Sequence, residues 1–304
     1  MSTRVPEQLV CPICGGGSRF AFEVGDRNRG LGPVRSSYQR CEACGTVFVA
    51  ETPDDLGRYY EADGYGSHSD HFVEEFVRRE QAKVALVSQF APAGRMVEVG
   101  PGSGMFARAA LRAGFDYQAV EMDARYCRYL TEELGVQAIN SDAPAEALSA
   151  LPASQAIVMW HVIEHLPQPT EVLRAACENL ADGGVLAIST PNPDSLQFRL
   201  LGRYWAHLDA PRHLQLIPHA ALLDSLARLG MRHVQTTTTD PVGLECNRMG
   251  WEYAIRRHPA RRASSATSMR SAKLLTICLG PVEQRRLLGA AYTSLFVKGP
   301  PAIR

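Results

Sequence analysis

The segment from Val97 to Gly104, VEVGPGSG, carries residue types suited to holding a nucleotide-like ligand. Its apolar run breaks into alternating glycines, and glycine allows positive φ and lets a ligand lie close against the backbone. A second apolar segment ends about twenty residues later in Glu121, where a carboxylate can accept hydrogen bonds from both hydroxyls of a ribose. Together these features predict a site for an adenosine-type ligand.

Four cysteines form two C-x-x-C-G motifs near the start of the chain. Two-residue spacing lets a tight turn aim both sulfurs at one ion, and two such turns supply the four thiolates of a tetrahedral zinc. A zinc with four protein ligands is closed, so it would stabilise a small β-rich unit and take no part in chemistry. The alternative is a chance set of surface cysteines. The predicted zinc ligands are Cys11, Cys14, Cys41 and Cys44.

The rest of the chain alternates strands and helices, which predicts an α/β fold. We expect a Rossmann-like, doubly wound sheet of seven strands with ligands at the carboxyl ends of its strands. Apolar residues three and four positions apart predict a covering helix over 72–90. The expected strands are 97–99, 113–121, 136–140, 155–160, 185–190, 233–239 and 293–298, and the other helices are 105–114, 124–135, 170–184 and 220–229.

Length and composition fit one large domain with additions, or two domains. The 304 residues are 45% hydrophobic with a formal net charge of +0, which argues against a surface devoted to nucleic acid. No signal peptide or membrane span is apparent, and the cysteine usage suits a reducing compartment, so we expect a cytoplasmic protein. The predicted division is a zinc ribbon (1–50), a linker and covering helix (51–92), a cofactor-binding core (93–240), and a helical, basic insert with the final strand (241–304).

The order of motifs resembles that of class I S-adenosylmethionine-dependent methyltransferases, in particular the bacterial small-molecule and sugar methyltransferases with an N-terminal zinc ribbon. The likeness covers residues 11–240, through VEVGPGSG, AVEMD, a strand-end Asp142, WHVIEHL and DAPRHL. A nicotinamide-dependent oxidoreductase would explain the glycines and Glu121, but it would leave the last two motifs without a role.

The resemblance implies a set of cofactor contacts. Glycines would line the methionine part, Glu98 would lie beneath its ammonium group, Glu121 would hold the ribose, and Asp142 would take the adenine amino group between apolar walls. From the residues alone, Glu98 paired with an arginine and Asp142 as the N-cap of a helix remain open. The cofactor residues are Glu98, Gly100, Gly102, Gly104, Glu121, Met122, Asp142 and Ala143.

The resemblance also places WHVIEHL beside the transferred methyl group. The protein must orient the acceptor and remove its proton, and histidine suits that task near neutral pH. His165, next to Glu164, is the first candidate base, followed by His161, with His213 in a loop that closes over the acceptor. Alternatively, Glu164 and His165 begin the next helix or hold loop backbone. These side chains also have the donor types for a second metal, since a few methyltransferases with an E-x-x-E-H pattern bind a divalent ion.

Two further regions are candidates for the acceptor side. Tyr59, Tyr60 and Tyr65 of the linker could fold over the cofactor or simply pack, and the aromatic and basic segment 198–214 could shape the acceptor pocket. Residues 256–288 include a basic run without acidic residues. Such a run is either a solvated loop or an arm that contacts a membrane surface or an anionic substrate.

We therefore predict a methyltransferase that uses S-adenosylmethionine and a structural zinc, with a small molecule, sugar or glycan as acceptor and no nucleic acid. A hydroxyl oxygen is the expected target, and a carbon of a nucleotide-linked deoxysugar is the alternative. A third interpretation, from another class, is a zinc-ribbon binding module with a vestigial cofactor fold. No motif identifies the acceptor, distinguishes O- from C- or N-methylation, or gives the oligomeric state.

Overall fold

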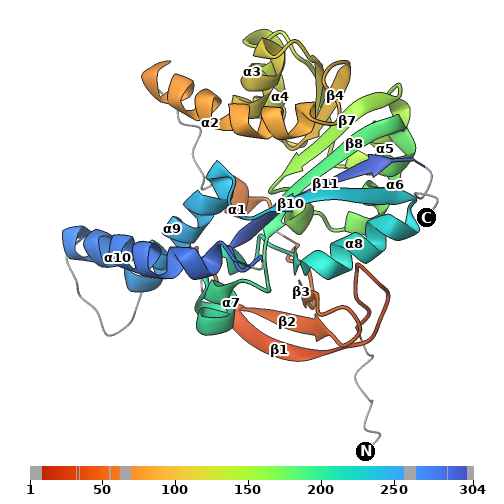
Figure 1. Ribbon diagram of the computed structural model, residues 1–304. Coiled ribbons are helices and arrows are strands. Elements are labelled where there is room, and N and C mark those ends of the chain that lie inside the picture. Colours follow the sequence, from red (N-terminus) through yellow and green to blue (C-terminus); the bar gives the residue numbers. More distant parts are fainter. Residues whose placement is uncertain are drawn as a thin grey trace, which may run out of the picture.

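The structure is a computed structural model that describes residues 9–31, 33, 35–54, 56–61, 70–256, 265–285 and 287–299. A large sheet with helices on both faces forms the main body, and a small sheet lies against it (Figure 1). Among the described residues, no helix is both long and apolar enough to span a bilayer.

The large sheet has seven strands in the order β10-β11-β8-β7-β4-β5-β6. Strands β4 to β8 pair in parallel, and β11 pairs antiparallel with both β8 and β10. This confirms the predicted doubly wound fold. The strands are β4 (Arg95–Val99), β5 (Asp116–Glu121), β6 (Gln137–Asn140), β7 (Ser154–Trp160), β8 (Leu180–Pro191), β10 (Met231–Thr237) and β11 (Ala291–Lys298).

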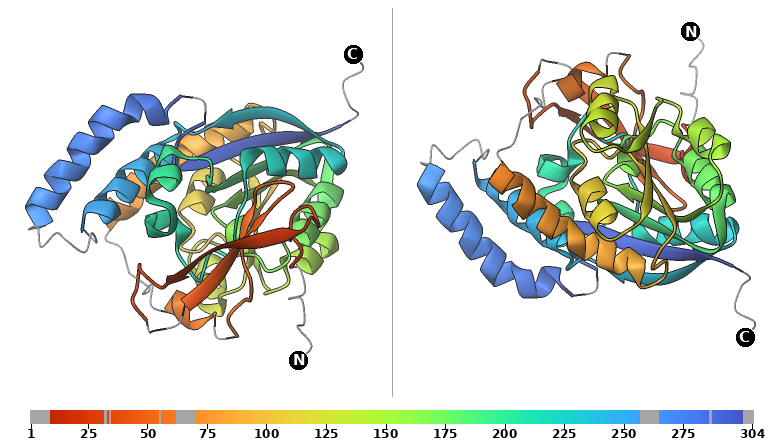
Figure 2. Two further views of the ribbon diagram at one scale, coloured as in Figure 1. Left: turned by 90° about the horizontal axis from the view of Figure 1, so that it is seen from below. Right: turned by 90° about the horizontal axis from the view of Figure 1, so that it is seen from above.

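Side chains of the central strands pack alternately into two separate hydrophobic cores, because successive strand residues point to opposite faces of the sheet. Met96 packs with the helices of one face, whereas Val97 packs with those of the other. Figure 2 shows the sheet and its helices from below and from above. One layer holds α2 (Asp70–Ser88), α3 (Met105–Arg112) and α4 (Ala124–Glu132), and the other holds α5 (Pro144–Ala150), α6 (Pro169–Asn179) and α8 (His219–Arg228).

Helix α6 ends earlier than the expected stop at the two glycines 183–184. It ends at Asn179, whose side-chain amide donates to the carbonyls of Leu148 and Leu151 at 3.0 and 2.9 Å. Leu180 already pairs with Ser154 of β7, so the chain enters the sheet there. Long-range contacts, rather than a glycine, terminate this helix.

The cysteine-rich segment forms a second sheet of β1 (Ser18–Gly25), β2 (Arg35–Cys41) and β3 (Val47–Val49). A fourth strand, β9 (Gln215–Leu216), comes from the loop after β8 and pairs antiparallel with β3. The sequence did not indicate this pairing. The N-terminal sheet is therefore hydrogen-bonded to the DAPRHL region, and short helix α1 (Arg58–Glu61) follows it.

The insert between β10 and β11 forms two helices, α9 (Pro241–Arg256) and α10 (Ser265–Glu283), that pack on each other outside the sheet (Figure 1). Much of the predicted basic run, residues 257–264, lies outside the described residues, as does Tyr65.

Candidate active site

The glycine-rich loop turns β4 directly into α3. Gly100, Gly102 and Gly104 have φ values of 70°, 51° and 72°, the left-handed region that side chains disfavour. A Cβ on Gly100 would lie 2.7 Å from Val162, and one on Gly104 would lie 2.9 Å from leucines of α4 and the turn after it. Only glycine fits at these two positions, so the loop backbone is a shaped cradle.

Glu121, at the end of β5, holds this loop in place. Its side chain is buried, and its carboxylate accepts the backbone N–H of Gly102 at 3.0 Å and that of Asp123 at 2.8 Å. Burial raises its pKa, although these two hydrogen bonds act in the opposite direction. Asn140, which the sequence analysis did not single out, donates to the carbonyls of Glu121 and Met122, both at 2.9 Å.

Glu98 lies inside β4 and points to the α2–α3 face of the sheet, where its carboxyl group is buried. Its hydrogen bond comes from the hydroxyl of Tyr117 on the adjacent strand, rather than from an arginine as one interpretation expected. Burial raises the pKa of Glu98 to about 8, so the group holds its proton at neutral pH.

Three other predicted cofactor residues follow β5 and β6, the two strands that come after β4 in the order of the sheet. Met122 follows β5 and is 60% exposed, as expected for a wall that a ligand would cover. Asp142 is exposed and Ala143 half-buried at the end of β6. Ala143 is the N-cap residue of α5 and no side chain caps that helix, so the N-cap interpretation of Asp142 is wrong.

The segment after β7 begins with a strained residue. His161 has φ 57°, and its backbone N–H donates to Ser189 at 2.9 Å. Its Nδ1 lies 3.2 Å from Oε1 of Glu164, and its Nε2 is buried with no hydrogen-bond partner among the described residues. The left-handed backbone conformation of His161 at the end of β7 directs its imidazole toward Glu164.

Glu164 is completely buried in the short 3-10 turn Ile163–His165. It accepts hydrogen bonds from Thr190 at 3.0 Å and from His161. Burial alone would raise the pKa of Glu164, but the hydrogen bond from His161 and the neighbouring imidazoles lower it to about 2. The carboxylate is therefore charged at neutral pH, inside the protein.

The side chains of His165 and His213 meet edge to face, with ring centroids 4.6 Å apart. Nδ1 of His165 lies 3.0 Å from the carbonyl of Arg212, and Nδ1 of His213 lies 2.8 Å from that of His207. Because a carbonyl only accepts, these contacts favour the tautomers in which Nδ1 carries the proton and Nε2 the lone pair. Burial lowers both pKa values, that of His165 to about 3.

Tyr60 and Asp209 complete this cluster. The Tyr60 hydroxyl lies 3.0 Å from Nδ1 of His165, and the guanidinium of Arg212 lies over the Tyr60 ring. Asp209 is buried between Arg29 of the N-terminal sheet, at 2.8 Å, and Arg212, at 2.5 Å. Burial raises the pKa of Asp209, but the charges of His213 and these two arginines outweigh it and hold the pKa well below its usual range.

The N-terminal sheet also fixes the backbone beside His213. The buried Tyr38 hydroxyl donates to the carbonyl of His213 at 2.8 Å, and the N–H of Val49 donates to Leu214 at 2.8 Å. Leu214 in turn donates to the carbonyl of Glu164 at 2.8 Å. The cysteine-bearing sheet is thus part of the support of the histidine cluster.

The four cysteine sulfurs lie together. Sγ atoms of Cys11 and Cys44 are 3.7 Å apart, those of Cys14 and Cys41 are 3.4 Å apart, and all four lie within 4.8 Å of one another. Tetrahedral Zn–S bonds of about 2.3 Å would place sulfurs about 3.8 Å apart. The donor set and its spacing therefore fit one zinc ion.

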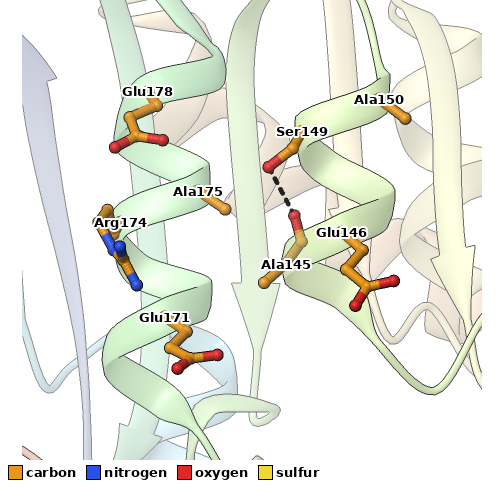
Figure 3. Close-up of a pocket in the computed structure, with 8 residues that line it drawn as sticks. All are labelled: Ala145, Glu146, Ser149, Ala150, Glu171, Arg174, Ala175 and Glu178. Carbon is orange, nitrogen blue, oxygen red and sulfur yellow. Dashed lines mark hydrogen bonds between the residues drawn. The ribbon is translucent and has the colours of Figure 1, made fainter.

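An open groove between α5 and α6 is separate from both clusters (Figure 3). None of the predicted catalytic, cofactor or zinc residues lines it. Its lining residues are Ala145, Glu146, Ser149, Ala150, Glu171, Arg174, Ala175 and Glu178.

A family model described as a methyltransferase domain matches residues 69–236. The chain therefore belongs to this family. With its Rossmann-like sheet it is a class I methyltransferase, an enzyme that uses S-adenosylmethionine. This supports the expected cofactor and disfavours both the oxidoreductase and the non-enzymatic module.

The sequences of individual curated relatives match part of this chain. A ubiquinone biosynthesis O-methyltransferase from Xanthomonas axonopodis is 31% identical over 119 residues, which are 37% of this chain and 50% of the relative. One from Psychrobacter cryohalolentis is 28% identical over 151 residues, 43% and 56% of the two chains. The chain thus spans about half the length of the curated relatives it matches. A putative sarcosine dimethylglycine methyltransferase from Galdieria sulphuraria shares the fold, with TM-score 0.52 and 15% identity over 81% of this chain and 99% of its own.

Proposed function

We propose that the enzyme transfers the methyl group to a hydroxyl oxygen of a small-molecule, sugar or glycan acceptor that binds beside His165. The observation that carries this proposal is the 3.0 Å contact of His165 Nδ1 with the Arg212 carbonyl, which favours the tautomer with Nε2 as the lone-pair acceptor. The names of the curated relatives, which are O-methyltransferases, support oxygen as the target.

The cofactor half would use the loop that only glycine can form. Gly100 and Gly104 pack against protein side chains and so fix the path of the loop, whereas a Cβ on Gly102 would meet open space, which leaves room for a ligand against the backbone there. Glu121 would accept from the ribose while it holds Gly102, and Asp142, which is exposed, would take the adenine amino group. Glu98, protonated at neutral pH, would lose its proton when a cationic group approaches. The proposed set is Glu98, Gly100, Gly102, Gly104, Glu121, Met122, Asp142 and Ala143.

The cofactor supplies an electrophilic methyl group, and the chain must then orient the hydroxyl and receive its proton. Nε2 of His165 would accept that proton. The resulting imidazolium is disfavoured by burial, since the pKa of His165 is about 3, but the Glu164 charge offsets part of that cost. His161 holds Glu164, and His213 packs against His165, so both would act mainly by positioning the base.

A divalent ion is a second way for the same cluster to act. One donor atom each from Glu164, His165 and His213 lies within 4.8 Å of the others, so these three fit a metal better than the set with His161. Such an ion would hold the acceptor oxygen directly and lower the pKa of its hydroxyl. Carbon methylation of a nucleotide-linked deoxysugar remains the alternative acceptor chemistry, with His165 removing a carbon-bound proton.

Calorimetric titration with S-adenosylmethionine, S-adenosylhomocysteine and NADPH tests the cofactor half. We expect the first two to bind and Glu121→Ala to weaken them by about thirtyfold or more, since a buried charged hydrogen-bond partner is lost. Asp142→Ala, which removes an exposed carboxylate, should have a smaller effect. Binding of NADPH alone would contradict the proposal.

Acceptor screening with phenols, catechols and sugar nucleotides then tests the acceptor half. His165→Asn should lower kcat by about a hundredfold or more and leave the affinity for S-adenosylmethionine unchanged. Activity that EDTA removes and Mg²⁺ restores, with the four-cysteine zinc retained, would favour the metal alternative. Full activity of His165→Asn without any added ion would rule out both roles.

A further inference from the structure

Helix α10 presents an apolar stripe to solvent. Leu274, Ile277 and Val282 are 62%, 63% and 42% exposed, although each is a large hydrophobic side chain. With the exposed Cys278 and Pro281 they follow a spacing of three and four residues, so they lie along one side of the helix. We call these five residues, 274, 277, 278, 281 and 282, the α10 stripe.

The opposite side of α10 is the one that attaches it to the protein. Glu283 is fully buried and accepts hydrogen bonds from Gln197 at 2.9 Å and Trp251 at 3.0 Å. Ala272 is buried in the same helix. In Figures 1 and 2, α10 is the outermost helix, with α9 between it and the sheet. The stripe therefore faces outward, and no described residue covers it.

Among the described residues, the charged side chains that α10 and the turn after it expose are all basic. Arg270, Lys273 and Arg285 are exposed beside it. The one acidic residue of α10 is Glu283, which is buried inside the protein. A helix with an exposed apolar face and flanking basic residues has the composition that binds in the interface of anionic lipid.

We propose that the α10 stripe docks on the surface of a bilayer that contains anionic phospholipid. The apolar side chains would enter the headgroup boundary, and the basic side chains would pair with lipid phosphates. A second copy of the chain fits this face less well. A stable dimer buries about 800 Å² on each partner, more than five side chains of one helix offer, and a two-fold axis there would bring like charges together.

The docking helix is connected to the acceptor side of the enzyme. Helix α9, on which α10 packs, is joined to the loop after β8 by a hydrogen bond. Nε2 of His207 donates to the carbonyl of Cys246 on α9, at 2.8 Å. The carbonyl of His207 is the group that orients His213. The buried Gln197 also donates to the α9 carbonyl of Asn247 at 2.7 Å. Docking through α10 would therefore hold the loop after β8 at a fixed place relative to the bilayer.

Vesicle co-sedimentation of the full chain tests the proposal, with equimolar phosphatidylcholine and phosphatidylglycerol compared with phosphatidylcholine alone. We expect binding to the anionic vesicles that weakens as salt is raised. Leu274→Glu/Ile277→Glu should weaken it by about tenfold or more, because two apolar side chains no longer enter the lipid. Phe20→Glu, a matched control with a 59% exposed side chain on β1, should bind as the wild type does.

A charge variant keeps the test independent of the apolar substitutions. Arg270→Gln/Lys273→Gln/Arg285→Gln should weaken binding to anionic vesicles by about tenfold or more and flatten its salt dependence. Unchanged affinity for S-adenosylmethionine and unchanged thermal unfolding show that each variant is folded. Three results would overturn the proposal. They are no binding of the wild type to anionic vesicles, binding of both variants as strong as that of the wild type, or a dimer seen by light scattering that the Leu274→Glu/Ile277→Glu variant abolishes.

Discussion

Two pairs of buried carboxyl groups, one in each half of the site, have opposite electrostatics. In the cofactor half, burial raises the pKa of Glu98 to about 8 and also raises that of Glu121. In the acceptor half, the pKa values of Glu164 and Asp209 are lowered despite burial. The same residue types under the same burial are thus protonation-prone in one half and firmly charged in the other.

The difference lies in the partners. Glu98 is bonded to a tyrosine hydroxyl, and Glu121 is held by backbone N–H groups. Glu164 faces imidazoles, and Asp209 is bonded to two guanidinium groups. The charge of Asp209 is therefore balanced by cations of the chain itself, and that of Glu164 is stabilised by the hydrogen bonds from His161 and Thr190. Neither Glu98 nor Glu121 has a hydrogen bond from a cationic side chain, and in the proposed binding mode the ammonium group of S-adenosylmethionine would balance Glu98.

Removal of the zinc ion that we propose the four cysteines bind should have the largest effect, and it should lower catalysis far more than cofactor affinity. Structural zinc contributes much of the folding free energy of a small metal-bound unit, so Cys41→Ser or chelation should unfold the N-terminal sheet and release the backbone of His213. We expect methyl transfer to fall by more than about a hundredfold while affinity for S-adenosylmethionine stays within about threefold. Calorimetry and an activity assay measure the two quantities.

A matched control is Cys127→Ser, which changes a buried thiol outside the zinc cluster. It should retain activity. If zinc removal weakened cofactor binding as much as it weakened catalysis, the two halves would not be independent.

Asp209→Asn tests the internally balanced charges. The substitution removes the buried negative charge that faces the half-buried Arg29 and Arg212, and breaking such a pair costs about 3 kcal/mol or more of stability. Urea unfolding at pH 7 measures the change. Glu74→Gln removes the exposed ion pair with Arg112 and should cost much less, because exposed ion pairs contribute little to stability. Equal effects of the two variants would mean that the Asp209 cluster contributes no more than a surface pair.

Glu98→Gln tests the unbalanced half through pH, with the smallest expected effect. Between its ordinary pKa of 4.5 and its folded pKa of about 8, the folded protein retains a proton that the unfolded chain releases. Stability of the wild type therefore falls as pH rises through this range, by up to about 1.4 kcal/mol per pH unit from this group. The variant lacks this contribution. Urea unfolding at pH 6, 7 and 8 should show wild type losing stability relative to Glu98→Gln, and parallel profiles would contradict the assigned pKa.

The sequence predicts contacts well only where the contacting residues lie close together in the chain, and the two halves of the candidate site differ in this respect. The glycine loop and the strand-end Glu121 lie within one strand–helix–strand unit, as the spacing predicted, and the structure adds the hydrogen bond from Gly102 to Glu121. The pairing of His161 with Glu164 is also local, three residues apart. These features could be predicted because periodicity and motif spacing describe contacts between nearby residues.

The acceptor half depends on contacts that no local pattern encodes. Strand β9 has two residues, too few for periodicity, and the Asp209 cluster joins residues of the N-terminal sheet to the loop after β8. Tyr38 supports His213 through a backbone carbonyl, which carries no sequence signal. Tertiary packing decided these positions, so the contact of the cysteine-rich sheet with the histidine cluster could be found only from the structure.

The pairing of β3 with β9 has a consequence for how the chain folds. The N-terminal sheet is synthesised first, but its fourth strand emerges only after most of the large sheet has been made. Closing so long a loop is entropically costly and slow, so the unit that appears first reaches its native form among the last. During that interval the edge of β3 is open to pairing with other chains, and early zinc binding would protect it while the ribosome completes the partner strand.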